Sequence, residues 1–340
     1  MLSLINYFNK DERMSIRKST ILILSFLAVI LAGCAPNAPH DNSLDPMSPN
    51  YKTTGALTGR VLTLGTPYSG IQNALVVIQQ NGSAELTASD GSFSFANAPA
   101  GLITILVTKA SYLNDTIQVT VPLGGSYDAE IHIDALPQIS NAQVVTSKID
   151  QWWPGPVYSA LVTANVTDPD GFLDVDTVYV QVDSLTFGMN PSAANKNYQV
   201  TIDATQLPNQ DLQWLVGRQL NVFAIDRSKG IGESPNFYVS RIIESEPVPT
   251  YPTSLDTTTA SPRFDWNPPP VSFNYTYQLQ VVRIDAGTQT VVWSQPGLNS
   301  SYVSYNYPGV LPTGTYFWTA AIIDAYGNAS RSKEASFVVP

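Results

Sequence analysis

Residues 275–281 read Tyr-Thr-Tyr-Gln-Leu-Gln-Val, with an apolar or aromatic side chain at every odd position and a polar one at every even position. Successive side chains of a β-strand point to opposite faces, so this alternation predicts a strand with one buried and one solvated face. The same alternation occurs in residues 116–121, and three valines at alternate positions, 178–182, share one face. No window of the sequence has a sustained 3.6-residue apolar period. The sequence therefore predicts an all-β protein.

Turn signals such as Asn81-Gly82, Asp90-Gly91 and Asp170-Gly171 separate the alternating segments. Short strands divided in this way are typical of antiparallel β-sandwiches.

Two proline-marked breaks, Leu136-Pro137 and Glu246-Pro247-Val248-Pro249, divide the body of the chain, and the second follows a strand expected at Phe237 to Ile243. We interpret both breaks as short, stiff spacers. The expected fold is three serial antiparallel β-sandwiches, which cover residues 55–136, 137–246 and 247–340.

The chain of 340 residues has 17 Lys and Arg against 27 Asp and Glu, a net charge of −10. Binding a nucleic-acid backbone needs clustered cations, so this balance argues against a nucleic-acid partner. One Cys and two His exclude an internal disulfide, a multi-thiolate metal site and a multi-His zinc centre.

A basic flank, Arg17-Lys18, precedes an apolar run from Ile21 to Ala32. About 12 helical residues rise roughly 18 Å, which is too short for a hydrocarbon core of about 30 Å. The run therefore predicts a secretory signal peptide over residues 1–33. Met14 gives a more ordinary signal peptide than Met1, so residues 1–13 are a candidate start-site artefact.

The run ends in Leu31-Ala32-Gly33-Cys34, which resembles the lipobox of bacterial lipoproteins. The resemblance implies cleavage before Cys34 and acylation of this residue, whose acyl chains then hold the protein to the membrane. The alternative is an uncleaved anchor that ends in a buried structural Cys34. Ala35 follows the Cys, where an Asp typically retains Gram-negative lipoproteins in the inner membrane, so the resemblance favours the outer membrane of the cell envelope.

Residues 34–54 comprise the lipidated Cys and a stretch rich in Pro, Asn, Ser and Asp with almost no apolar residues. Such a composition cannot bury enough surface to order itself, so it predicts a flexible tether.

The first domain resembles the carboxypeptidase regulatory-like family, a transthyretin-like sandwich. The resemblance rests on Gly59-Arg60-Val61, on residues 71–77, on residues 87–95 with the Asp90-Gly91 turn, and on Pro99-Ala100-Gly101 and residues 107–112. It implies an accessory module of a surface or secreted protein, with Phe93 and Phe95 in the core. Carbohydrate binding is known only for the wider fold.

The third domain resembles fibronectin type III. Phe264-Asp265-Trp266 matches the early strand whose Trp fills the core, and residues 277–281 match the following strand on the facing sheet. Residues 311–318 carry the corner, which implies that the buried Tyr316 returns its hydroxyl to nearby backbone. Residues 324–330 match the usual ending, with Gly327 in the hairpin turn.

The middle domain resembles bacterial Ig-like domains more loosely, through residues 166–171 and a late strand at residues 221–226.

An acidic group in the middle domain offers hard oxygen ligands that suit Ca²⁺. Its spacing, Asp-x-Asp-Gly-x-x-Asp, resembles some cadherin-like inter-domain sites and lacks the EF-hand pattern. The alternative is ordinary turn chemistry, because Asp and Gly form turns in any sandwich loop. The candidate ligands are Asp168, Asp170, Asp174, Asp176 and Asp226.

The segment Trp152-Trp153-Pro154-Gly155-Pro156 places two adjacent aromatic side chains in a loop. An exposed ring could stack on a sugar or anchor a protein partner. The alternative is that one or both rings cap the end of the sandwich.

Catalysis has little support in the sequence. A Ser or Cys nucleophile needs a nearby base, commonly His. His132 is predicted on the solvent face of a strand, His40 lies in the tether, and no spacing marks an acidic pair. We expect that the protein is not an enzyme and that it requires no cofactor.

The leading hypothesis is a non-enzymatic, membrane-anchored binding or scaffolding module of the bacterial cell envelope, with a protein or polysaccharide as partner. The second is a carbohydrate-binding accessory of a glycan-uptake system, and the third is an envelope hydrolase.

Overall fold

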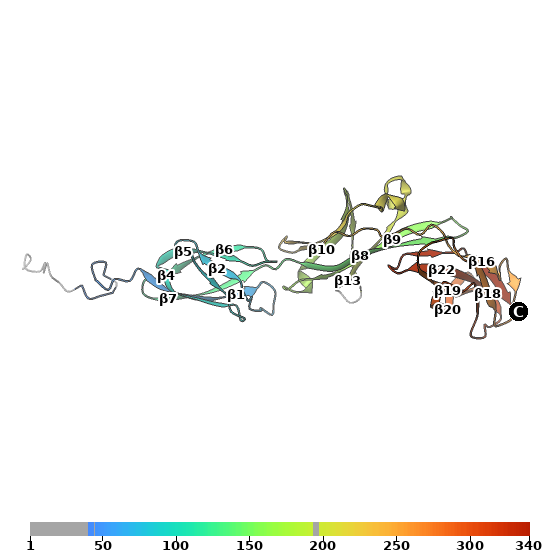
Figure 1. Ribbon diagram of the computed structural model, residues 1–340. Helices are drawn as coiled ribbons and strands as arrows, with labels where there is room; N and C mark the ends of the chain where they lie inside the picture. Colours follow the sequence, from blue (N-terminus) through green and yellow to red (C-terminus); the bar gives the residue numbers. More distant parts are fainter. Residues whose placement is uncertain (1–39, 44, 193–196) are drawn as a thin grey trace, which may run out of the picture.

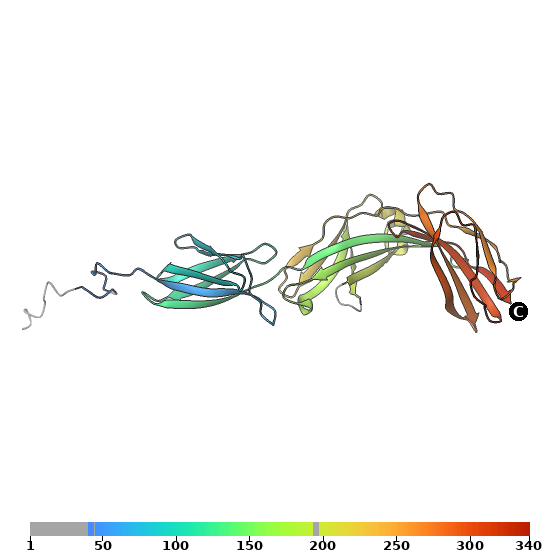
Figure 2. The same cartoon turned by 60° about the horizontal axis from the view of Figure 1, so that its bottom comes forward.

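The structure, a computed structural model, describes residues 40–43, 45–192 and 197–340. Over these residues the regular structure consists of β-strands and four short 3-10 turns. Three β-sandwiches follow one another in a row, with the segment before the first strand at one end and the C-terminus at the other (Figures 1 and 2). The expected all-β class of serial sandwiches is therefore confirmed.

The first sandwich packs a three-stranded sheet, in the order β4-β1-β7, against a four-stranded sheet, in the order β3-β2-β5-β6. Phe93 and Phe95 both point into the core, as the alternation predicts, and Gly91 adopts the positive φ of 79° that the turn before them requires. The strands are β1 (Thr54–Thr63), β2 (Leu75–Ile78), β3 (Ser83–Leu86), β4 (Ser92–Pro99), β5 (Gly101–Thr108), β6 (Asp115–Val121) and β7 (Ser126–Ile133).

The first and last strands of this sandwich are parallel, which departs from the antiparallel expectation. β1 pairs with β7 from Ala56 opposite Ser126 to Thr63 opposite Ile133. The chain enters the sandwich at one end and leaves it at the other, so its first and last strands run in the same direction. Two further pairs are also parallel: β17 (Asp256–Thr257) with β24 (Ala335–Val339), and β8 (Gln138–Ile149) with β23 (Ala329–Arg331).

The second sandwich packs the sheet β11-β10-β14-β15 against the sheet β12-β13-β9-β8. Val178, Val180 and Val182 are buried on one face of β10, as predicted. Its elements are β8 (Gln138–Ile149), β9 (Val157–Thr167), η1 (Phe172–Asp174), β10 (Val175–Val182), β11 (Leu185–Gly188), β12 (Asn190–Pro191), β13 (Asn197–Asp203), η2 (Ala204–Gln206), η3 (Pro208–Gln210), η4 (Leu212–Leu215), β14 (Leu220–Asp226) and β15 (Ile231–Glu233).

The third sandwich packs the sheet β16-β18-β21 against a sheet built on β22, β19 and β20. Its strands are β16 (Val248–Tyr251), β17 (Asp256–Thr257), β18 (Arg263–Asn267), β19 (Tyr275–Asp285), β20 (Thr288–Asn299), β21 (Ser304–Asn306), β22 (Gly314–Asp324), β23 (Ala329–Arg331) and β24 (Ala335–Val339).

The aromatic core of the third sandwich confirms the details expected of it. Trp266 is 2% exposed and packs against Tyr277 of the facing sheet. The hydroxyl of the fully buried Tyr316 donates a hydrogen bond to the carbonyl oxygen of Pro312 at 2.7 Å. Gly327 has a φ of 91° in the turn between β22 and β23.

The second and third sandwiches share one continuous sheet. β23 of the third sandwich pairs with β8 of the second, with Ala329 opposite Ser147 and Arg331 opposite Ile149. Strand order in this sheet therefore runs from β12 through β8 and β23 to β20. Backbone hydrogen bonds thus join the two sandwiches directly.

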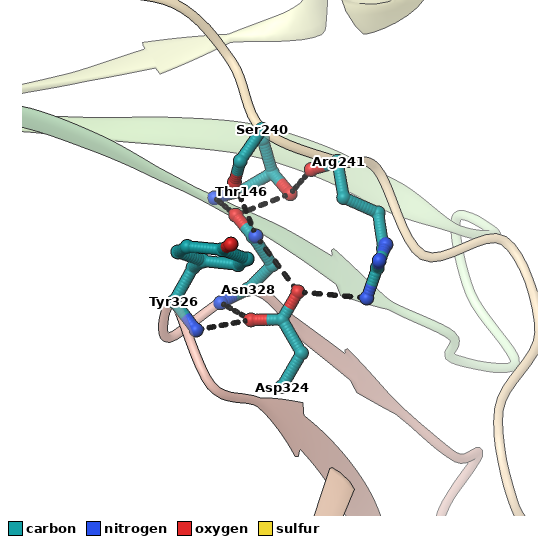
Figure 3. Close-up of polar contacts among 6 residues, drawn as sticks. All are labelled: Thr146, Ser240, Arg241, Asp324, Tyr326 and Asn328. Carbon is teal, nitrogen blue, oxygen red and sulfur yellow. Dashed lines mark hydrogen bonds and ion pairs between the residues drawn. The ribbon is translucent and has the colours of Figure 1, made fainter. Parts of the chain in front are cut away.

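A buried polar network centred on Asn328 reinforces this joint (Figure 3). The Asn328 side-chain oxygen accepts hydrogen bonds from the backbone N–H of Thr146 at 2.9 Å and from its hydroxyl at 3.2 Å. The Asn328 amide nitrogen donates to Ser240 and to Asp324, and Arg241 forms an ion pair with Asp324 at 3.2 Å. The network connects the second sandwich, the third sandwich and the segment between them.

That segment was predicted to contain a strand at Phe237 to Ile243 followed by a stiff spacer, and both predictions are wrong. Apart from one bridge between Phe237 and Leu220, residues 237–247 form no strand. Side chains of β8 hold them instead: the Thr146 hydroxyl donates to the Arg241 carbonyl at 2.6 Å, and Lys148 pairs with Glu246 at 2.6 Å. Ile243, on the middle-domain side of the expected boundary, is buried in the core of the third sandwich.

At Leu136-Pro137, the other predicted stiff spacer, β8 begins at the next residue, Gln138. The proline packs closely: a Cβ added at Gly232 would meet the Pro137 carbonyl oxygen at 1.9 Å.

In the part of the chain that the structure describes, no helix has the length and apolar character needed to cross a membrane. The predicted signal peptide and lipobox, Cys34 included, lie outside the described residues.

Candidate functional site

Four of the five predicted metal ligands come together at the joint between the first and second sandwiches. Asp168 and Asp170 lie in the loop after β9, Asp174 ends η1, and Asp226 is the last residue of β14. The loop forms as its Asp and Gly residues predict, since the Asp170 N–H donates to the Asp168 carboxylate at 2.8 Å. Pairing of β10 with β14 sets Asp226 opposite Val175 and so beside Asp174.

Asp134, which directly follows β7 of the first sandwich, completes the cluster. Carboxylate oxygens of Asp134, Asp170 and Asp174 all lie within 4.8 Å of one another, as do those of Asp168, Asp174 and Asp226. Asp174 belongs to both groups and links them. We call these five residues the joint cluster.

The Asp170 side chain also connects the two sandwiches, because its carboxylate accepts hydrogen bonds from backbone N–H groups. One of its carboxylate oxygens accepts the N–H groups of Leu64 and Gly65, at 2.6 and 3.0 Å, and the other accepts the N–H of Ala135 at 2.7 Å. Gly65 has no space for a side chain, because a Cβ there would lie 1.8 Å from the Asp170 carbonyl oxygen. The first sandwich therefore rests directly on the Asp170 loop.

Apart from Asp170, every member of the joint cluster has a buried carboxylate oxygen without a hydrogen-bond partner. Asp134 is 9% exposed and Asp226 is fully buried. Both oxygens of Asp134 and one oxygen each of Asp168, Asp174 and Asp226 have no hydrogen-bond partner. A buried carboxylate without a partner is costly in free energy.

Burial and repulsion from neighbouring carboxylates raise the pKa values of Asp134, Asp168 and Asp174. Burial raises the pKa of Asp168 to about 7, and the charges of Asp170, Asp174 and Asp226 add to the effect, while the hydrogen bond from the Asp170 N–H opposes it. Burial likewise raises the pKa of Asp134 to about 6. The Ser228 hydroxyl opposes this second rise, although it does not reach hydrogen-bond geometry with either Asp134 oxygen.

Asp176, the fifth predicted ligand, does not belong to the cluster, and this part of the prediction is wrong. Asp176 lies on the outward face of β10 and forms an ion pair with the exposed Lys229 at 3.2 Å. Regular alternation would put Asp176 on the same face as Val178, but the pairing of β10 with β14 has a register shift between Val175 and Thr177, and this irregularity turns Asp176 outward.

Asp134 is not among the ligands that the sequence predicts. Alternation after Ile131 and Ile133 places Asp134 on the solvent face, and only the docking of the second sandwich buries it. The sequence feature that could have indicated a role for Asp134 at a joint is its position at the end of a domain, next to a proline break.

Trp152 and Trp153 lie at the other joint, between the second and third sandwiches, and both are exposed, Trp152 by 72% and Trp153 by 86%. The alternative that they cap the end of the sandwich is therefore wrong. The Trp152 indole N–H donates to the Glu334 carbonyl at 2.9 Å, and the Lys333 ammonium lies 4.6 Å from the Trp152 ring centroid. These contacts fix Trp152 against the third sandwich and leave Trp153 free to meet a ligand.

Two surface hollows adjoin the tryptophans. One, of about 280 Å³, lies between Trp152, residues 248–254 and Lys333. The other, of about 610 Å³, includes both tryptophans with the polar side chains of Gln151, Gln289 and Arg331. The exposed rings and these two hollows form what we call the tryptophan face.

Among the described residues, neither histidine forms a hydrogen bond with a Ser, Thr or Cys side chain, and His40 pairs with Asp45. The Nδ1 of His132 contacts the Thr63 carbonyl at 2.9 Å and its Nε2 contacts Glu130 at 2.9 Å. Burial lowers the pKa of His132, but these two hydrogen bonds outweigh it and raise the value overall. Both ring nitrogens are thus engaged in holding the outer face of β7.

No protein-family model matches the chain, and no curated protein matches it. Solved structures align with the chain at low identity. The FN1–FN3 domains of chicken CNTN1 are 11% identical, with 85% of this chain and 96% of that chain covered and a TM-score of 0.33. The fibronectin(III)-like modules of Clostridium thermocellum CbhA are 14% identical, with 60% and 93% covered and a TM-score of 0.29.

A DUF3823 family protein from Parabacteroides merdae is 15% identical, with 56% of this chain and 100% of that chain covered and a TM-score of 0.26. At these identities and TM-scores we take neither a fold, a family nor a ligand from these similarities.

Proposed function

We propose that the protein is a non-enzymatic binding module of the bacterial cell envelope, held to the membrane by acyl chains on Cys34. The lipobox-like segment supports the anchor, and Ala35 favours the outer membrane. Residues 34–54 would then connect the membrane to the first sandwich, with the third sandwich farthest from it.

The observation that carries the binding role is the exposure of Trp153, at 86%, on a rigidly joined part of the molecule. An exposed indole forgoes the free energy of burial, about 25 cal/mol per Å² of apolar surface. Such rings are favoured where a partner covers them. The shared sheet and the Asn328 network hold the tryptophan face in a fixed shape, so little ordering is needed when a partner binds.

A polysaccharide is the narrower candidate ligand. Indole rings stack on sugar faces, while the amides of Gln151 and Gln289 and the guanidinium of Arg331 supply hydrogen bonds for hydroxyl groups. The larger hollow, about 610 Å³, has the size of a small-ligand site. This chemistry supports a carbohydrate-binding accessory of a glycan-uptake system as the second candidate function, with an envelope protein as the alternative partner.

A hydrolytic role lacks this kind of support. Paired carboxylates that cleave glycosides must flank a cleft. Glu334 is the one carboxylate among the residues that line the two hollows of the tryptophan face, so neither hollow is lined by such a pair.

The test is binding by the full chain, purified in a non-ionic detergent, to a glycan array and to isolated envelope fractions. We expect Trp153→Ala and Trp152→Ala to reduce binding at least about tenfold, which corresponds to about 1.4 kcal/mol. The matched control is Tyr326→Ala, because Tyr326 is 67% exposed and lies at the turn between β22 and β23. Full binding by both Trp variants would overturn the tryptophan face as the site.

A further inference from the structure

The joint cluster carries five carboxylates and no balancing cation among the described residues. None of its five aspartates forms an ion pair, and the nearby Lys229 is already paired with Asp176. Arg227 is exposed and lowers the pKa of Asp174 only as the last of several influences. The negative charge concentrated at this joint therefore needs another partner.

The orphaned oxygens point to what that partner is. Five carboxylate oxygens without hydrogen bonds are buried together, two on Asp134 and one each on Asp168, Asp174 and Asp226. Asp226 is fully buried and its other oxygen accepts the Gly230 N–H at 2.7 Å, which fixes the side chain. A Cβ at Gly230 would lie 2.3 Å from the orphaned Asp226 oxygen, so a side chain at position 230 would collide with this oxygen.

The spacing of the carboxylate oxygens fits Ca²⁺. Two oxygens that bind the same Ca²⁺ at 2.3–2.6 Å can lie no more than about 5 Å apart. Each of the two groups meets this limit, with all ligand oxygens within 4.8 Å of one another. The donors are all hard oxygens, which disfavours Zn²⁺ and copper. Mg²⁺ usually keeps several waters and seldom occupies a cage made wholly of protein groups.

We propose that the joint cluster binds Ca²⁺ and that the ion locks the first sandwich onto the second. One or two ions fit, because Asp174 is shared by both groups. Asp134 comes from the first sandwich and Asp168, Asp174 and Asp226 from the second, so the ion bonds to both. Asp170 would act in both ways, as a ligand and as the acceptor for the Leu64 and Gly65 N–H groups.

Without the ion, the same five charges repel one another across the joint. Removal of Ca²⁺ is therefore expected to loosen the contact between the sandwiches while each core stays folded, since both hydrophobic cores are separate from the cluster. The protein would be stiff in millimolar Ca²⁺ and hinged at Leu136 without it.

The first experiment is a calorimetric titration of the full, chelator-treated chain in non-ionic detergent with CaCl₂ at pH 7.5. We expect saturable binding of one or two ions, and at least about tenfold weaker binding of MgCl₂. The double variant Asp168→Asn with Asp174→Asn keeps the side-chain shapes and should lose the binding. Asp176→Asn is the matched control and should bind as the parent does. Absence of heat in the parent, equal binding of Mg²⁺, or unchanged binding by the double variant would overturn the proposal.

The second experiment measures the joint itself. Leu102 of the first sandwich and Ile231 of the second are 64% and 53% exposed, so labels can be attached there. The single native Cys of the chain is Cys34, the predicted acylation site. Spin labels on Leu102→Cys and Ile231→Cys report the distance between the sandwiches by pulsed electron resonance. We expect a narrow distance distribution with Ca²⁺ and a broad one with chelator. Circular dichroism confirms that the variants remain folded, and a distribution that ignores Ca²⁺ would contradict the locking role.

Discussion

The side-chain oxygen of Asn328, in the third sandwich, accepts the backbone N–H of Thr146, in the second, at 2.9 Å across 182 residues of sequence. Asn328 is fully buried. An apolar replacement cannot supply the acceptor that the Thr146 N–H needs.

We expect Asn328→Ala to lower the free energy of unfolding by about 2–4 kcal/mol, because it leaves several buried polar groups without partners. Chemical denaturation of the full chain measures this, with Asn299→Ala as control, since Asn299 is exposed and its side-chain oxygen accepts the N–H of nearby Ser301. Equal denaturation midpoints for the two variants would contradict a structural role for the network.

Tyr316→Phe removes the hydroxyl that donates to the Pro312 carbonyl at 2.7 Å. The expected loss is about 1–3 kcal/mol in the stability of the third sandwich, because a partly buried carbonyl loses its partner. Thermal unfolding of Tyr316→Phe is compared with that of Tyr302→Phe, whose side chain is 46% exposed. No difference between these two variants would show that the corner is not stabilising.

Gly65→Ala forces a Cβ against the Asp170 carbonyl oxygen, which lies 1.8 Å from the position that the Cβ would take. We expect the loop to move away from Asp170, so that Ca²⁺ binds several-fold more weakly and limited proteolysis near Leu136 becomes faster. Gly188→Ala is the matched control, because a Cβ there meets no atom within 4 Å. Identical Ca²⁺ affinities would mean that the sandwiches do not press together at this point.

The stability of the chain should depend on pH in opposite directions with and without Ca²⁺. Burial raises the folded-state pKa values of Asp134 and Asp168 to about 6 and about 7. These values lie above the unfolded value of about 3.9. A raised carboxyl pKa means that the folded state holds extra protons, so the stabilisation is complete below about pH 4 and is lost as pH rises through 6 to 7.

In chelator, the melting temperature should therefore rise as pH falls from 8 to 5.5. With Ca²⁺ it should fall over the same range, because the ligands must be deprotonated to bind the ion. The raised pKa of His132 acts in the same direction as the carboxyls, so the double variant Asp134→Asn with Asp168→Asn provides the reference. A pH slope in chelator that is unchanged in this variant would assign the effect to Asp174 or His132 instead.

Cys34→Ser should abolish acylation and release the protein from the membrane fraction. Metabolic labelling with palmitate measures the first effect and cell fractionation the second. Ala35→Ser retains the Cys and should still be labelled. Label on the Cys34→Ser variant would rule out the lipobox interpretation.

The sequence predicts local structure well and contacts between domains poorly. Alternation within β10 correctly buries Val178, Val180 and Val182, and the corner motif correctly returns the Tyr316 hydroxyl to backbone, because both depend on residues close in the chain. Asp168, Asp170 and Asp174 share one loop, so their proximity could also be predicted.

The docking of whole sandwiches decides the rest. Asp134 becomes a member of the joint cluster only because the second sandwich covers it. The residue pattern of β7 cannot predict this contact between domains. Residues 237–247 look like a strand and spacer by composition, yet their partners are side chains of β8, about a hundred positions earlier. Asp176 shows the opposite error, since closeness in sequence to Asp174 did not place it on the same side of the strand.

The parallel pairing of β1 with β7 has a mechanical consequence. A tensile force applied between the two ends of the chain pulls these neighbouring strands in opposite directions along their length. All the hydrogen bonds of the ladder from Ala56–Ser126 to Thr63–Ile133 are then sheared together instead of unzipped one by one. The first sandwich is therefore expected to resist extension better than a hairpin of equal length pulled open from its ends.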